Sequence, residues 1–325
     1  MKITDVGGEF ALIDQLCSLV PTEHRDLIVS VGDDAAVIRT APEPAPYLLV
    51  TTDILVEDRH FRKQWSGPHQ IGIKAAECNI SDIAAMGGRP SWMFVSVVLT
   101  RDTDLAWSRD LYAGIAEACR RYGVVVAGGD TTQGAVNTIN ITLLGSVSPE
   151  NLCLRSQAAP DDLLLVTGPL GAPAAALALL EQGMTPSAYL LEKHLTPISR
   201  MDISSAIAPL ANAMIDISDG LGSEVHHICR KSRVGAEIYT RDLPIHDDVL
   251  EAAGKLGVNP APWALSGGED FELLFSMPAD KLAALEKTGV VVHTVGKITD
   301  IDGNAVLIAT DGRRMPLPGG YNHFA

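Results

Sequence analysis

Short apolar runs alternate with amphipathic stretches along the chain. The apolar runs are typical of strands, which we expect at residues 47–52, 92–99, 124–127, 138–147, 163–166, 234–239, 271–275, 290–295 and 305–308. The amphipathic stretches repeat apolar positions three and four residues apart and predict helices at residues 69–86, 105–122, 172–182, 199–212, 221–231, 247–256 and 279–288. This alternation predicts a mixed α/β (α+β) fold class.

The chain is long for a single hydrophobic core. Its 325 residues suggest two domains. The stretch Ser148-Pro149-Glu150 separates the two sets of predicted elements. We therefore predict an N-terminal domain at residues 1–149 and a C-terminal α/β domain at residues 150–325.

The composition is that of a globular protein with an acidic surface. Hydrophobic residues make up 46% of the chain, and the formal net charge is −15. Nucleic acids and anionic membranes require a basic surface, so we expect neither as a partner. The sequence has no apolar stretch of about 18 residues and no signal-peptide pattern at its start, and its five cysteines are widely spaced. These features predict a cytoplasmic protein with reduced thiols.

Acidic motifs recur along the chain, in most cases where an apolar run ends or a helix turns. They are GDD at 32–34, TTD at 51–53, Glu57-Asp58, NISD ending at Asp82, GGD at 128–130, DISD at 216–219 and GGED ending at Asp270. We expect a rigid scaffold to bring such groups together on its loops. Two carboxylates about 4 Å apart repel by roughly 4 kcal/mol at an effective dielectric constant near 20. A cluster therefore predicts bound divalent cations, and ligand sets rich in oxygen and free of sulfur favour Mg²⁺ over zinc.

Each motif also has a purely structural interpretation. A single Asp more often caps a helix or turn, an isolated GGD is more often a turn, and DISDG is typical of an N-cap before a helix at Leu221. A helix N-terminus and a pair of glycines are also suited to binding phosphate. The combination of the motifs favours the functional interpretation. The sequence lacks GxGxxG and a P-loop, so any ATP site is of another kind.

The order of the motifs resembles that of the thiamine-monophosphate kinase family. The resemblance rests on GEF, GDDAAV, TTDILVEDRHF, NISDIAAMGGRP, AGGDTTQG, LRS, IDISDGL, WALSGGEDFELLF and GYNHF, which follow one another across nearly the whole chain. It implies the two-domain fold of the aminoimidazole ribonucleotide synthetase superfamily, in a homodimer whose N-terminal sheets pair across the subunits. It also implies several Mg²⁺ ions, ATP as co-substrate, and direct phosphorylation of thiamine monophosphate to thiamine diphosphate.

The resemblance also implies roles for individual residues. The metal ligands would be Asp33, Asp34, Thr51, Thr52, Asp53, Asp82, Asp130, Asp216 and Asp219. ATP would contact Tyr112, Gly129, Asp130, Arg155 and Ser218. Thiamine monophosphate would contact His60, Glu269 and Tyr321, with Phe324 close behind Tyr321. No general base is expected, because an acceptor phosphate is already largely ionised at neutral pH, and positioning and charge neutralisation carry most of the catalysis.

Two alternatives stay open at this point. The chain could be another member of the superfamily, and aminoimidazole ribonucleotide synthetase is the hardest of these to exclude. Selenophosphate synthetase would need a reactive cysteine within residues 1–16, and the hydrogenase maturation enzyme would need a C-terminal cysteine, and the sequence has neither. From a different class, the chain could be a non-catalytic acidic protein that binds cations or nucleotides.

Overall fold

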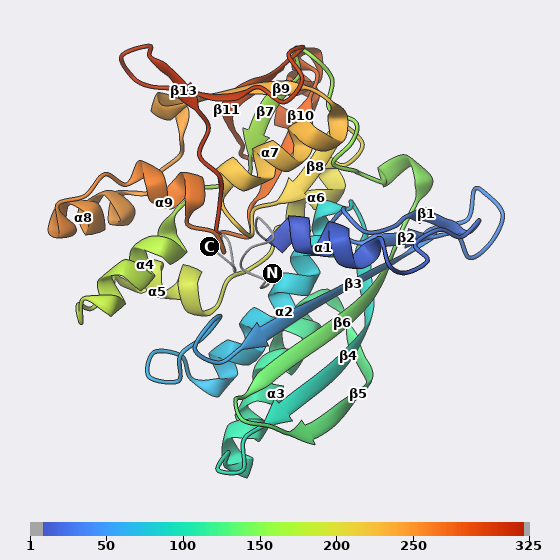
Figure 1. Cartoon of the computed structure of the whole chain (residues 1–325), viewed down its shortest axis with the longest axis vertical. Coiled ribbons are helices and arrows are strands. Elements are labelled where there is room, and N and C mark those ends of the chain that lie inside the picture. Colours follow the sequence, from blue (N-terminus) through green and yellow to red (C-terminus); the bar gives the residue numbers. More distant parts are fainter. Residues whose placement is uncertain (1–8, 322–325) are drawn as a thin grey trace.

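The computed structural model describes residues 9–321, which form two β-sheets with helices packed around them (Figure 1). The first sheet has the strand order β1-β2-β3-β6-β4-β5. Its strands are β1 (Leu27–Val29), β2 (Ala36–Ile38), β3 (Tyr47–Val56), β4 (Arg89–Leu99), β5 (Val125–Gln133) and β6 (Thr138–Val147). Neighbouring strands are antiparallel, except for the parallel pair β4 and β5. The helices of this half are α1 (Glu9–Cys17), α2 (Pro68–Ala85) and α3 (Leu105–Tyr122).

The second sheet has the strand order β13-β12-β9-β11-β7-β10-β8. Its strands are β7 (Leu163–Val166), β8 (Ala213–Asp216), β9 (Gly235–Tyr239), β10 (Leu273–Met277), β11 (His293–Thr299), β12 (Ala305–Ile308) and β13 (Arg314–Pro316). It is mostly antiparallel, with β9 and β12 parallel. The surrounding helices are α4 (Ala172–Glu181), α5 (Ala188–Leu195), α6 (Met201–Ile207), α7 (Leu221–Ser232), α8 (Asp247–Leu256), α9 (Ala261–Ser266) and α10 (Leu282–Glu286). The predicted mixed α/β class is confirmed.

Helix α2 lies between the two halves of the molecule. It packs against β3 and β6 of the first sheet and against β8 and α6 of the second half. Its contact with α3 is close because two glycines face the neighbouring backbone. A Cβ atom at Gly72 would lie 2.1 Å from the Leu111 carbonyl oxygen, and one at Gly114 would lie 1.9 Å from that of His69. The side chains of α2 therefore meet residues from both halves of the chain.

The face of the first sheet that points away from α2 is partly apolar and exposed. Side chains alternate between the two faces of a strand, so Ile54, Trp92 and Phe94 point outward and are 52%, 52% and 39% exposed. The edge strand β5 is exposed along its whole length. Solvent-exposed apolar patches of this kind mark interaction surfaces. We call Ile54, Trp92, Phe94 and Val125, which is paired with Trp92, the open sheet face.

Several sequence-based boundaries differ from the structure. The strand expected to end at residue 127 continues to Gln133, so Gly128-Gly129-Asp130 lies within β5, and neither the expected end of the strand nor the alternative interpretation as a turn was right. Gly129 (φ +153°) is required for this pairing, because a Cβ atom there would lie 1.8 Å from the Val95 carbonyl oxygen on β4. The helix predicted at residues 199–212 is shorter in the structure, where α6 ends at Ile207. Strand β8, which begins at Ala213, was not predicted, because a buried strand of four residues gives no clear periodicity.

Two buried glutamates, Glu77 on α2 and Glu272 beside β10, form ion pairs between segments that are distant in sequence. Glu77 accepts hydrogen bonds from Arg121 Nη1 at 2.5 Å, the Tyr122 hydroxyl at 3.1 Å and the Ser199 backbone at 2.9 Å. Glu272 contacts Lys193 Nζ at 3.1 Å and Arg200 Nη1 at 2.8 Å.

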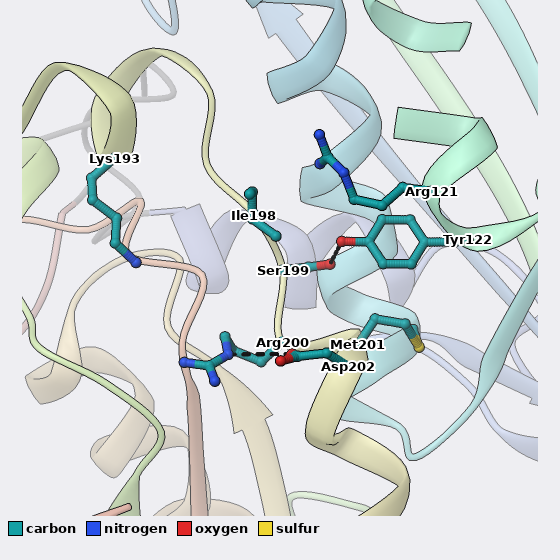
Figure 2. A pocket seen from close by; sticks show the side chains of 8 residues that line it. All are labelled: Arg121, Tyr122, Lys193, Ile198, Ser199, Arg200, Met201 and Asp202. Carbon is teal, nitrogen blue, oxygen red and sulfur yellow. Dashed lines mark hydrogen bonds and ion pairs between the residues drawn. The ribbon is translucent and has the colours of Figure 1, made fainter. Parts of the chain in front are cut away.

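An open cavity of about 490 Å³ lies over these pairs (Figure 2). Its lining consists of Arg121, Tyr122, Lys193, Ile198, Ser199, Arg200, Met201 and Asp202. Each of the three cations in this lining already contacts a carboxylate. The Arg121–Glu77 pair therefore joins α3 to α2, the Ser199 backbone N–H joins the second half to Glu77, and the Glu272 pairs join segments within the second half.

We expect Arg200→Met to lower the free energy of unfolding by about 2 to 4 kcal/mol, because it leaves a buried carboxylate with one cation instead of two. Urea denaturation measures the change. Arg313→Met is the matched control, since Arg313 pairs with Asp311 at 2.6 Å on the surface, and we expect no measurable effect there. Equal losses in the two variants would contradict the structural role of the Glu272 pair.

Candidate active site

Three aspartates from distant parts of the chain meet between the two sheets. Asp34 lies just before β2, Asp82 on α2, and Asp216 at the end of β8. One carboxylate oxygen from each lies within 4.8 Å of the other two. We call these three residues the acidic cluster. Its position follows from the fold, because α2 contacts both β3 and β8.

Burial and mutual repulsion raise the pKa values of these carboxyl groups. Burial and then the charge of Asp34 raise the pKa of Asp216 to about 8. The same two causes, in the same order, raise the pKa of Asp33 to about 7 and that of Asp53 to about 6. Burial, followed by the charges of Asp53 and Asp216, raises the pKa of Asp82 well above its usual value. A group of carboxyls with these shifts has a high affinity for either protons or cations.

The donor set fits a hard divalent cation. All three side chains of the acidic cluster offer oxygen, and Asp34 Oδ2 is buried without a hydrogen-bond partner in residues 9–321. A buried carboxylate oxygen without a partner loses the energy of its hydration, and a metal ion would replace it. Residues of the acidic cluster therefore match the expected preference for Mg²⁺.

Strand β3 places its polar residues on alternate faces of the sheet. Thr51 and Asp53 face α2, and the Thr51 hydroxyl donates a hydrogen bond to Asp82. Thr52 faces the other way, where its hydroxyl donates to the Ile141 carbonyl oxygen at 3.1 Å. The structure thus brings Thr51 and Asp53 toward the acidic cluster and directs the Thr52 side chain away from it.

Arg155 is the cation closest to the acidic cluster. Its guanidinium pairs with Asp34, its Nε lies 3.7 Å from Asp33 Oδ1, and its backbone N–H donates to Asp33 Oδ2 at 3.3 Å. This residue offsets part of the negative charge of Asp33 and Asp34, two expected metal ligands. The sequence predicted it as an ATP contact, so a bound nucleotide would compete for the guanidinium.

A cavity of about 460 Å³ lies beside the acidic cluster and between the two halves. His60 comes from the β3–α2 connection, Ser218 and Asp219 from the β8–α7 connection, and Glu269 from the α9–β10 connection. The full lining is Glu9, Asp53, Ile54, Leu55, Asp58, Arg59, His60, Phe61, Arg62, Trp65, Lys74, Cys78, Leu177, Glu181, His194, Ser218, Asp219, Gly267, Glu269, Phe271 and Tyr321. All three residues expected to contact thiamine monophosphate, His60, Glu269 and Tyr321, therefore line one cavity with Asp53.

The last described residues are fixed to the cavity wall. The Tyr321 backbone N–H donates to the Asp219 carbonyl oxygen at 2.9 Å, and the Ser266 hydroxyl donates to the Gly319 carbonyl oxygen at 2.6 Å. A Cβ atom at Gly320 would lie 2.3 Å from the Asp219 carbonyl oxygen, so this approach requires glycine. Tyr321 is held at the cavity by these bonds, whereas Phe324 lies outside the described residues, as do Gly8 of GEF and Asn322 to Phe324 of GYNHF.

Three residues near the cavity were not predicted from the sequence. Lys74 contacts Glu269 with Nζ to Oε1 at 2.6 Å, and His194 Nδ1 lies 3.7 Å from Glu269 Oε2. Glu224 on α7 is buried and accepts a hydrogen bond from the Asp219 backbone N–H at 3.0 Å. For Lys74, the one signal in the sequence was its spacing from Asp82, because two helical turns place both side chains on the same side of α2.

The structure does not bring all expected nucleotide contacts to the acidic cluster. Asp130 and Gly129 lie on β5, which is separated from β3 by β6 and β4. Three strand spacings amount to about 14 Å. Asp130 is exposed, and its Oδ1 accepts a hydrogen bond from the Thr131 N–H at 2.8 Å. Tyr112 is half-exposed on α3. Within a single chain, these residues stand apart from Asp34, Asp82 and Asp216.

No helix within residues 9–321 combines the length and apolar character needed to cross a membrane.

Comparisons with known proteins agree along the whole chain. Residues 32–147 match the family of AIR synthase related proteins in its N-terminal domain, and residues 159–308 match its C-terminal domain. Thiamine-monophosphate kinase of Escherichia coli (strain K12) is 36% identical, with 98% of each chain covered. The same enzyme of Aquifex aeolicus (strain VF5) is 33% identical, with 100% of each chain covered. The solved structure "AaThiL complexed with AMPPCP and TMP" has a TM-score of 0.88 at 31% identity and covers 99% of each chain.

We expect the stability of the metal-free protein to fall as the pH rises from about 4 to about 8. The folded-state pKa values of Asp53, Asp33 and Asp216, about 6, 7 and 8, lie above the unfolded value, which is about 4. The native state therefore holds more protons than the unfolded state in this window, so stability is lost as these groups ionise. Thermal unfolding in EDTA at pH 5.5 and 8 measures this effect.

Magnesium supplies the control for this prediction. Because cation binding competes with protons, Mg²⁺ should raise the melting temperature by several degrees at pH 8 and by less at pH 5.5. Asp53→Asn should weaken both effects, whereas Asp280→Asn, at an exposed position, should change neither. Stability that rises with pH in EDTA would show that the cluster is not the dominant titrating group.

Proposed function

The chain belongs to the thiamine-monophosphate kinase family, as its motifs predicted, and from this premise we propose that it phosphorylates thiamine monophosphate with ATP. An oxygen of the acceptor phosphate bonds to the γ-phosphorus while the bond from that phosphorus to the β–γ bridging oxygen breaks. The products are thiamine diphosphate and ADP. The chain is accordingly a phosphotransferase with a phosphate group as acceptor.

The observation that carries the proposal is the cavity beside the acidic cluster. Asp53, which approaches Asp34 and Asp82, lines the same cavity as His60, Glu269 and Tyr321. A phosphate held near Asp53 would therefore leave the rest of a small organic phosphate within reach of these three side chains. The relative "AaThiL complexed with AMPPCP and TMP", whose first ligand is an ATP analogue, has the same fold over 99% of its chain.

Magnesium fits the reaction because two polyanions must approach each other. We assign its binding to Asp34, Asp82 and Asp216, with Asp33, Thr51, Asp53 and Asp219 nearby, and with Asp130 supplied as argued below; Thr52, whose side chain points away, could offer only its backbone oxygen. When bound, Mg²⁺ neutralises phosphate charge and holds the attacking and leaving oxygens in line. The protein residues position the two substrates and exclude water. No general base is required of them, because the acceptor phosphate is ionised at neutral pH.

A homodimer would complete the nucleotide half of the site. The open sheet face and the edge strand β5 are exposed and partly apolar, and two-fold dimers are the commonest oligomers. In a dimer that sets the exposed edge strand β5 along the partner's sheet, Gly129 and Asp130 would lie beside the partner subunit, and we propose that they reach its cluster there. In this arrangement residues 1–149 form the domain that dimerises, and residues 150–325 form the flanking domain. We also propose that the reaction takes place in the cytoplasm.

We expect Asp53→Asn and Asp130→Asn each to lower turnover by at least about 100-fold, because each removes a carboxylate that would hold a cation against the phosphates. Release of ADP in the presence of thiamine monophosphate measures turnover. Without Mg²⁺, the Asp53→Asn protein should be at least as stable as the wild type, since it relieves repulsion.

Asp280→Asn is the control and should retain full activity. Formylglycinamidine ribonucleotide in place of thiamine monophosphate tests for aminoimidazole ribonucleotide synthetase activity. A reaction without any acceptor tests for simple ATP hydrolysis. Wild-type activity in both acidic variants at saturating Mg²⁺ would remove the metal assignment. ADP release with formylglycinamidine ribonucleotide alone would replace the proposed substrate.

We expect the protein to sediment as a dimer of about 69 kDa, twice the 34.5 kDa chain. Trp92→Glu places a charge in the open sheet face and should shift the protein to monomers and lower its turnover. Val291→Glu is the matched control, because Val291 is an exposed apolar residue of the second half. A wild-type protein that is monomeric and fully active at micromolar concentration would contradict the shared site.

A further inference from the structure

One end of the cavity holds three polar side chains, and two of them, Lys74 and His194, had no role predicted from the sequence. Lys74 contacts Glu269 at 2.6 Å, and its Nζ also donates to the His60 carbonyl oxygen at 3.3 Å. His194, near the end of α5, lies on the other side of Glu269, with Nδ1 3.7 Å from Oε2. Lys74, His194 and Glu269 all line the cavity. We call this end of the cavity the Glu269 end.

Helix α2 fixes the distance between the Glu269 end and the acidic cluster. Lys74, Cys78 and Asp82 follow one another at intervals of one helical turn along the same side of α2. Eight residues at 1.5 Å each place Lys74 about 12 Å from Asp82 along the helix axis. A substrate whose phosphate lies at the acidic cluster would therefore extend its opposite end toward Lys74, Glu269 and His194.

Charge at the Glu269 end is set by this arrangement. Burial opposes ionisation of Glu269, but the attraction of Lys74 is the largest effect in the other direction, and the pKa of Glu269 is lowered. Burial first, and then the charge of Lys74, lower the pKa of His194 to about 4. At neutral pH the cavity thus presents a carboxylate beside a neutral imidazole, which has one N–H donor and one nitrogen acceptor.

One nitrogen of the His194 imidazole, Nδ1, lacks a hydrogen-bond partner among the described residues. His194 is 8% exposed, and its Nδ1 is buried with no hydrogen-bond partner in the part of the chain that the structure describes. The 3.7 Å separation from Glu269 Oε2 is too long for a hydrogen bond. Buried polar groups in folded proteins are rarely left in this state, and an exception beside a ligand cavity points to a bond that the ligand completes.

We propose that His194 is a further substrate-recognition residue, which together with Glu269 receives the aminopyrimidine ring of thiamine monophosphate. This inference rests on the proposed function. The aminopyrimidine lies at the end of the substrate opposite its phosphate, and its exocyclic amine has two N–H donors next to acceptor nitrogens of the ring. An amine between Glu269 Oε2 and His194 can donate to both, which a carboxylate and an unprotonated imidazole accept.

The neutral state of His194 makes this pairing selective. A protonated histidine would have no acceptor to offer the amine, and a hydrophobic residue would leave one N–H of the amine without a partner. Lys74 has a positioning role here, because its ion pair holds the Glu269 carboxylate charged and fixed. The cationic thiazolium ring then lies between this end and the phosphate, where Tyr321 and Asp53 line the cavity.

The test compares thiamine monophosphate with oxythiamine monophosphate, in which an oxo group replaces the exocyclic amine. We expect the wild type to prefer the amine by at least about 10-fold in kcat/KM, because the oxo group cannot donate to Glu269. His194→Leu should raise the KM for thiamine monophosphate by roughly 5- to 30-fold, leave the KM for ATP within about 2-fold, and narrow the preference for the amine. His194→Asn or His194→Gln should keep part of the preference for the amine, because each places a polar group near the position of Nδ1 or Nε2.

His69→Leu is the matched control, because His69 is a half-exposed residue of α2 that does not line the cavity. The proposal would be overturned if His194→Leu raised the KM for thiamine monophosphate and the KM for ATP equally, or raised neither. If His194→Leu unfolds, the wild-type comparison of the two substrates still decides, since equal use of both would also overturn it. Failure of the proposed function has a different result, because the wild type would then release no ADP with thiamine monophosphate.

Discussion

The repulsion between buried carboxylates is the constraint on which the rest of this structure depends. Asp34, Asp82 and Asp216 belong to three separate elements, and only the fold brings their oxygens within 4.8 Å. Such a cluster has few stable states: protons on the carboxyls, a neighbouring cation such as Arg155, or bound metal. Arg155 supplies the second of these, and burial, which raises the pKa values of the carboxyls, favours the first. Cation binding would replace them, and this exchange links the stability of the fold to its chemistry.

The position of α2 explains why one cavity is able to serve two tasks. The helix is buried between the two halves and has Asp82 near one end and Lys74 two turns earlier. Charge of opposite sign therefore lies along one side of a single rigid element. The negative end is suited to cations and the phosphates they bind, and the positive end orders Glu269. A rigid helix keeps this spacing constant to a degree that loops do not achieve.

The sequence predicted what local patterns encode and missed what distant segments create. Helix α3 and strands β6, β7 and β12 follow from apolar periodicity and match the predicted ranges, and the motif order identified the family. The strand β5 was expected to end before Gly128-Gly129-Asp130 because glycine is rare inside strands, and only the close pairing with β4 shows why the strand needs Gly129 there. The grouping of His60, Glu269 and Tyr321 with Asp53 rested on resemblance, whereas Lys74 and His194 have ordinary local surroundings. Their relation to Glu269 exists only after α2, α5 and the α9–β10 connection have packed together.

The attachment of Tyr321 to Asp219 has a consequence for how the protein is made. The cavity wall contains both Glu9 and Tyr321, residues separated by 312 positions in the chain. During synthesis, the first sheet and α2 emerge from the ribosome long before β8 adds Asp216 and longer still before Tyr321 arrives. The nascent chain therefore carries Asp34 and Asp82 without their third partner, and contacts between such distant segments form late in folding. The acidic cluster therefore forms only after β8 has been made, and the complete cavity wall only after Tyr321 has been made.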